Sequence, residues 1–167
     1  IGNGWQHSLS RPDDKPLGEK NQFAVRGQLN FDLGPDSNLL LRANLVHDKS
    51  ENVALTPLDG RTLGLPSAQS KPTTGTVIFS TGDNRVADWT AAFRPRRDNK
   101  LAGVAATLNV GLGGLTLTSI SAYDHFTRNE FNDYDGAAQS DSNAQNVSDI
   151  KAFSQEVRLA DQNGADG

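Results

Sequence analysis

The sequence predicts an all-β protein, and more narrowly a part of an antiparallel transmembrane β-barrel with long extracellular loops. Three observations predict this fold class. Five segments alternate apolar and polar residues with period two, short turns alternate with long connections, and arginines occupy the polar row of several strands. No segment has the long apolar stripe of an amphipathic helix. The sequence also lacks an apolar stretch of about 18 residues, so no transmembrane helix is predicted.

The first two predicted strands, residues 21–32 and 39–48, show the clearest alternation. Apolar side chains fall on one face of each strand and polar side chains on the other, as in a half-exposed strand. The apolar row holds Phe23, Val25, Leu29, Phe31, Leu39, Leu41, Ala43 and Leu45. The polar row holds Arg26, Gln28, Arg42 and Asn44.

The three later strands are predicted at residues 101–112, 115–126 and 151–160. The third alternates Val104, Ala106, Leu108 and Val110 with small and polar residues. The fourth is ambiguous, because Ile120 lies opposite the other apolar residues unless a bulge intervenes. The fifth sets Phe153, Val157 and Leu159 against Ser154, Glu156 and Arg158.

The connections predict a membrane barrel better than the strands do. Short turns occur at residues 32–37 and 111–114, whereas residues 1–20, 49–100 and 127–149 are long. A compact soluble domain rarely contains a connection of about 50 residues, but outer-membrane barrels combine short periplasmic turns with long extracellular loops. Strands of about 10 residues, tilted by about 45°, span an apolar band of about 25 Å.

The polar row predicts which face of the strands is in contact with water. Arg26, Gln28, Arg42, Asn44, Glu156 and Arg158 are long hydrogen-bonding side chains, and we expect them to face a water-filled lumen. Arginine at the lipid midplane costs about 2–4 kcal/mol, so the apolar row is expected to face lipid. The alternative is a secreted β-sandwich that binds carbohydrate, in which the apolar row forms the core.

Composition excludes several classes. The chain has 167 residues, 35 % of them hydrophobic, and a net charge of −4 that offers no basic field for nucleic acid. There is no cysteine, hence no disulfide or thiolate metal site. There is no methionine either, so we expect Ile1 to begin a processed, truncated or partial chain.

Two stretches resemble the barrel of TonB-dependent outer-membrane receptors: GGLTLTSISAYDHFTRNEFNDYDG (113–136) and VSDIKAFSQEVRLA (147–160). Barrel strands of that family often read TLTSITAY and FSQELRL, which Thr116–Tyr123 and Phe153–Leu159 match. Residues 18–48 and 98–114 resemble neighbouring strands of such receptors.

The resemblance implies a barrel of 22 strands around an N-terminal plug, in the outer membrane of a Gram-negative bacterium. It implies binding of an iron–siderophore, cobalamin or saccharide and import powered by TonB. Residues 1–167 would form part of the barrel domain, with about five strands, and the plug and TonB box lie outside this chain. The expected partners are outer-membrane lipid and lipopolysaccharide, and the TonB complex through the missing N-terminal part. A passive outer-membrane channel remains an alternative.

Candidate ligand-binding residues lie in the long connections. Arg94, Arg96 and Arg97 could bind an anionic ligand or lipopolysaccharide phosphates, or form a solvated loop. Trp89, Phe131 and Tyr134 could stack on a ligand, although such aromatics also pin a loop to itself or anchor a barrel in the headgroups.

No catalytic motif, metal site or cofactor is predicted. The three histidines lack zinc-binding spacing, and the acidic stretch DYDGAAQSDSN lacks the glutamate that closes a calcium loop. Neither a nucleophile-elbow serine motif nor a phosphate-binding loop occurs, so an enzyme is not expected.

Overall fold

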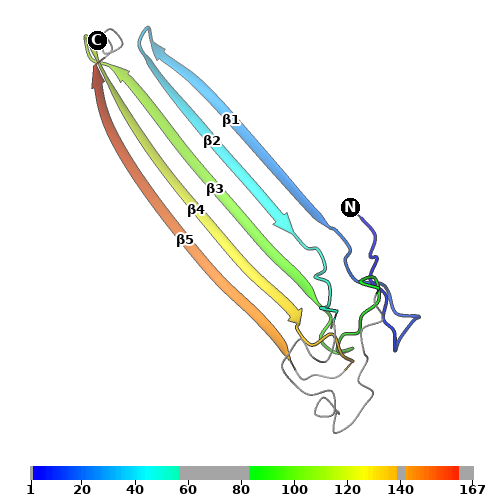
Figure 1. Ribbon diagram of the computed structural model, residues 1–167. Coiled ribbons are helices and arrows are strands. Elements are labelled where there is room, and N and C mark those ends of the chain that lie inside the picture. Colours follow the sequence, from blue (N-terminus) through cyan, green and yellow to red (C-terminus); the bar gives the residue numbers. More distant parts are fainter. Residues whose placement is uncertain (1, 57–82, 139–141, 162–167) are drawn as a thin grey trace. The chain divides into compact units, whose positions relative to one another are not determined.

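The computed structural model describes residues 2–56, 83–138 and 142–161, and its regular structure is all β. Five strands form one antiparallel sheet in the order β1-β2-β3-β4-β5, with each strand beside its neighbours in sequence (Figure 1). Their bounds are Gln22–Gly34 (β1), Ser37–Asp48 (β2), Arg96–Gly111 (β3), Leu115–Asp133 (β4) and Asn143–Asp161 (β5). The sheet is open, with β1 and β5 at its edges. No helix of the described residues is long and apolar enough to span a membrane.

All five predicted strands are present, and three of them extend five or more residues beyond one predicted end. β3 begins at Arg96 instead of residue 101, β4 ends at Asp133 instead of 126, and β5 begins at Asn143 instead of 151. The added ends are mostly polar, and their few large apolar residues, Phe131, Val147 and Ile150, do not recur with period two over enough positions for a sequence pattern to reveal a strand. The prediction of a long connection at residues 127–149 is therefore wrong, because β4 and β5 leave only residues 134–142 between them.

The turn between β3 and β4 depends on glycine. Gly113 and Gly114 have φ angles of 61° and 101°, in the left-handed region that side chains with a Cβ rarely adopt. The connection between β2 and β3 is long, as predicted, although residues 57–82 of it lie outside the described part of the chain.

The chain divides into two compact units. Unit 1 comprises Ile1–Gln22, Asp48–Asn99 and Arg128–Val147, and unit 2 comprises Phe23–His47, Lys100–Thr127 and Ser148–Gly167. Unit 1 thus contains the N-terminal segment and the two connections that follow β2 and β4. Residues of both connections therefore belong to one unit. Unit 2 contains the strand segments with the clearest alternation.

Unit 2 exposes its apolar row instead of packing it into a core. Val25, Leu41 and Val157 are 59 %, 38 % and 64 % exposed, and Leu108 is half-buried. Gly103 is the only buried residue among the described residues of unit 2. We call the side with these apolar residues the apolar face and the side with Arg26 and Arg42 the polar face.

Unit 1 has a small core of its own. Leu17, Ala54, Ala87 and Trp89 are buried together. The N-terminal segment reaches this core by antiparallel pairing of Gln6 with Leu17 and by parallel pairing of His7 with Val86. Backbone pairing therefore fixes the segment before β1 against the connection between β2 and β3.

Candidate functional site

Four of the six predicted lumen-facing residues line one hollow on the polar face of unit 2. Arg26 and Gln28 come from β1, and Arg42 and Asn44 come from β2; the hollow has a volume of about 340 Å³. Its other walls include Ala105, Ile120, Ala122 and Asp124 from β3 and β4. Ile120 thus lies on the polar face within the continuous strand β4, and the bulge considered for it is not present.

A row of side-chain hydrogen bonds crosses the polar face from β1 to β4. Asn38 donates to Asn30 Oδ1 over 2.9 Å, and Asn109 donates to Asn38 Oδ1 over 3.0 Å. The Thr118 hydroxyl donates to Asn109 Oδ1 over 2.7 Å. Such cross-strand pairs add stability and fix register. This row was not predicted from the sequence. The asparagines at 30, 38 and 109 all fall on the polar face of their strands, and that shared position could have indicated it.

The other two predicted lumen-facing residues pair with each other. The Arg158 guanidinium donates to the Glu156 carboxylate on the same strand, β5. Among the described residues Glu156 forms no ion pair with Arg26 or Arg42, because β3 and β4 separate β5 from the strands that carry these arginines.

Two of the three predicted anion-binding arginines have polar partners within unit 1. Arg94 Nε lies 2.8 Å from Glu51 Oε1, and its Nη2 donates to the Pro16 carbonyl over 3.0 Å. Arg97 Nε donates to Asn52 Oδ1 over 2.8 Å. Each guanidinium therefore has its own partners.

Arg96 is exposed and stacks on an aromatic ring. Its guanidinium carbon lies 4.4 Å from the centre of the Phe131 ring, a cation–π contact. The Phe131 ring also contacts the Phe93 ring edge to face, with 4.9 Å between the ring centres. Tyr134 is 49 % exposed. Ligand binding by Arg96, Phe131 and Tyr134 stays a prediction.

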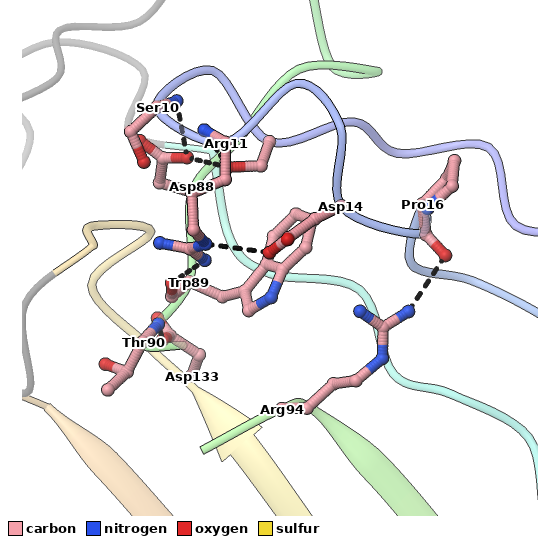
Figure 2. A network of polar contacts seen from close by, with 10 residues as sticks. Ser10, Arg11, Asp14, Pro16, Asp88, Trp89, Thr90, Arg94 and Asp133 are labelled. Carbon is pink, nitrogen blue, oxygen red and sulfur yellow. Dashed lines mark hydrogen bonds and ion pairs between the residues drawn. The ribbon is translucent and has the colours of Figure 1, made fainter. Parts of the chain in front are cut away.

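Trp89 is held inside unit 1. Its side chain is 1 % exposed, and the Arg11 and Arg94 guanidinium carbons lie 5.5 and 5.7 Å from the ring centre. Arg11 also donates to the Trp89 carbonyl over 2.6 Å and pairs with Asp14 (Figure 2). The ring offers no open surface to a ligand in this structure. It holds the connection against the N-terminal segment, whereas the alternative raised from the sequence was that it pins the loop to itself.

Asp133 joins the two connections of unit 1. Its carboxylate accepts hydrogen bonds from the Thr90 and Gly136 amides, each over 3.0 Å, and Figure 2 shows it beside Thr90. The side chain is 2 % exposed. Burial raises the pKa of Asp133 to about 6, although the Thr90 amide favours the charged form, and the Asp135 carboxylate raises it further.

Two more buried polar residues organise unit 1 and were missed from the sequence. Gln6 donates to the Ala54 carbonyl over 3.0 Å and accepts from the Ala54 amide over 2.8 Å. Asp88 accepts from the Ser8 hydroxyl over 2.5 Å and from the Ser10 amide over 3.1 Å. No local signal distinguishes these residues from solvated loop residues, because their partners are distant in sequence.

In the described ranges 2–56, 83–138 and 142–161, no cluster of three or more acidic or histidine side chains is placed to hold a metal ion. Comparisons with protein-family models, with curated proteins and with solved structures found no match for this chain.

Proposed function

We propose that this chain forms part of the β-barrel of a TonB-dependent outer-membrane receptor. The receptor binds a scarce nutrient of the iron–siderophore, cobalamin or saccharide class at its extracellular loops and imports it with energy supplied through TonB. One observation carries the proposal: an antiparallel sheet exposes an apolar row on one face and a guanidinium-bearing row on the other.

The apolar face has the character of a lipid-facing surface. Phe153 and Leu29 are 69 % and 62 % exposed, far more than a core residue would be. Contiguous apolar surface of this kind on a soluble protein marks a site of contact with a membrane or another protein. The strand segments of unit 2 are long enough to cross an apolar band of about 25 Å.

Three polar side chains on the apolar face, Ser119, Ser121 and Gln155, hydrogen-bond to one another. Gln155 accepts a hydrogen bond from the Ser121 hydroxyl and donates to Ser119 Oγ over 3.0 Å. Ser121 lines the same hollow as Leu41 and Phe153, so it lies on the apolar face. Because lipid offers no hydrogen-bond partners, a polar group there has to be satisfied within the protein. This cluster is therefore compatible with contact to acyl chains.

Unit 1 would hold the extracellular loops. Its two connections are joined by the Asp133 hydrogen bonds and by the Asp88 amide, which donates to the Gly136 carbonyl over 3.3 Å. Loops fixed to each other in this way form a preorganised surface on which Arg96 and Tyr134 remain exposed. These two residues are the best candidates for contact with the nutrient.

Adjacent labels on β5 test the lipid-facing assignment. This sequence has no cysteine, so Phe153→Cys and Ser154→Cys can each carry one nitroxide, in the natural protein with any cysteine outside this sequence replaced by serine and reconstituted into phosphatidylcholine vesicles. Successive strand residues point to opposite faces, so we expect oxygen to relax the label at 153 and a water-soluble nickel chelate to relax the label at 154. A label at 153 that neither reagent reaches would place the apolar row in a dry protein core and overturn the proposal.

Energised import separates the receptor from a passive channel. Cells that express the natural protein would be given radiolabelled ferric siderophore, cobalamin or maltodextrin, with and without a protonophore. We expect uptake of one of them to stop when the proton gradient collapses. Uptake that continues without the gradient would favour the channel.

A further inference from the structure

The hollow on the polar face contains two arginines, Arg26 and Arg42, and one carboxylate, Asp124. Within the described part of the chain, Arg42 Nη2 has one weak hydrogen bond, 3.4 Å from Thr107 Oγ1, and neither Arg26 nor Arg42 forms an ion pair. Two arginines of unit 1 differ in this respect, since Arg94 and Arg97 both pair with carboxylates. The positive charge of the hollow is thus left for a ligand.

The charge of the hollow matches a monovalent anion. Arg26 and Arg42 contribute +2 and Asp124 contributes −1, which leaves a net charge of +1. The side-chain amides of Gln28 and Asn44 add neutral donors. A guanidinium presents its N–H groups in a fork that matches the two oxygens of a carboxylate.

Small residues make room for such a ligand. Ala105 and Ala122 lie in the wall of the hollow, where longer side chains would fill it. Beside them, a Cβ on Gly103 would stand 2.3 Å from Asp124 Oδ1 and 2.8 Å from Asn44 Oδ1. The side chains of Asp124 and Asn44 therefore lie across Gly103.

We propose that this hollow binds a carboxylate group, held by the guanidinium groups of Arg26 and Arg42. Asp124 lowers the net charge of the hollow to +1 and so favours a monovalent anion over a dianion. The site lies on the polar face and needs only access to water. The proposed carboxylate site is therefore independent of whether the apolar face contacts lipid, and the nitroxide experiment on β5 does not test this site.

Acetate binding to the natural protein in detergent micelles tests the proposal. Line broadening of the acetate methyl resonance measures the affinity, with chloride exchanged for acetate at constant ionic strength. We expect Arg26→Gln and Arg42→Gln each to weaken binding about tenfold, the effect of losing one charge-assisted hydrogen bond. We expect Asp124→Asn to strengthen binding, because it raises the net charge of the hollow from +1 to +2. The matched control is Arg158→Gln, which removes an arginine of the same sheet that pairs with Glu156 and does not line the hollow.

Three results would overturn the proposal. The first is acetate binding no stronger than that of chloride. The second is equal loss in Arg158→Gln, which would indicate general charge attraction instead of a site. The third is tighter binding of inorganic phosphate than of acetate, which would assign the hollow to a dianion. A fold defect in a variant cannot mimic the expected pattern, because Asp124→Asn must change affinity in the opposite direction to the arginine variants.

Discussion

Asp133 should make unit 1 more stable near pH 5 than near pH 7, and Asp133→Asn should remove this difference. The carboxylate is 2 % exposed and accepts hydrogen bonds from the Thr90 and Gly136 amides. Burial raises its pKa from the ordinary 3.8 to about 6. Losing the proton therefore costs free energy in the folded protein that it does not cost in the unfolded chain.

The magnitude follows from the difference between the two pKa values. A difference of about 2 units, at about 1.4 kcal/mol per unit, gives at most about 3 kcal/mol. Between pH 3.8 and about 6 the folded protein holds the proton and the unfolded chain does not, so the free energy of unfolding falls as pH rises. Asp48 acts in the opposite direction. Burial disfavours its charge, but Ser50 and Arg97 hold its pKa below the ordinary 3.8, so its contribution is lost only as pH falls below that value.

Hydrogen exchange of the Thr90 and Gly136 amides measures the effect directly. After correction for the intrinsic exchange rate, we expect their protection to fall by about 10-fold between about pH 5 and about pH 7, because only the interval from pH 5 to the folded pKa of about 6 contributes there. In Asp133→Asn the slope should vanish, and the loss of one acceptor should cost about 1 kcal/mol near pH 5. The control is Asp32→Asn, at an exposed carboxylate of β1. Protection that rises with pH, or an unchanged slope in Asp133→Asn, would refute the reasoning.

Two further substitutions test the core of unit 1. Trp89→Ala should lower the free energy of unfolding of the unit by about 3–5 kcal/mol in denaturant unfolding, because it removes the largest fully buried side chain and leaves a cavity. Trp5→Ala, at a side chain that is 42 % exposed, should cost clearly less, and equal costs would contradict the packing described here. Gln6→Leu should cost about 1–3 kcal/mol, since it leaves the amide and carbonyl of Ala54 without partners, and unchanged protection of the Ala54 amide would contradict this.

Much of the sheet could be predicted from local patterns. Side chains of a strand alternate between two faces, so the period-two pattern in β1 and β2 identified both the strands and their faces. The glycine pair at 113 and 114 predicted the turn after β3, because few other residues adopt its backbone angles. The ends of β4 and β5 were missed, since their stability comes from pairing with each other and not from an apolar row.

The roles of the loop residues could not be predicted in the same way. Asp88 is buried because it meets Ser8, 80 residues away, and Gln6 is buried because it meets Ala54, 48 residues away. Arg94 and Trp89 were candidate ligand-binding residues in the sequence, but in the structure they hold the loops of unit 1 together.

The sequence by itself determined that five strands are present, where the two short turns lie and which chemical character each face has, because these depend on neighbours two or three residues apart. Only the tertiary structure decided which charged and aromatic side chains are satisfied internally and which remain open, as Arg26 and Arg42 do in the polar-face hollow. The physical reason is that burial and pairing of a side chain depend on contacts across the chain, and no local pattern records them.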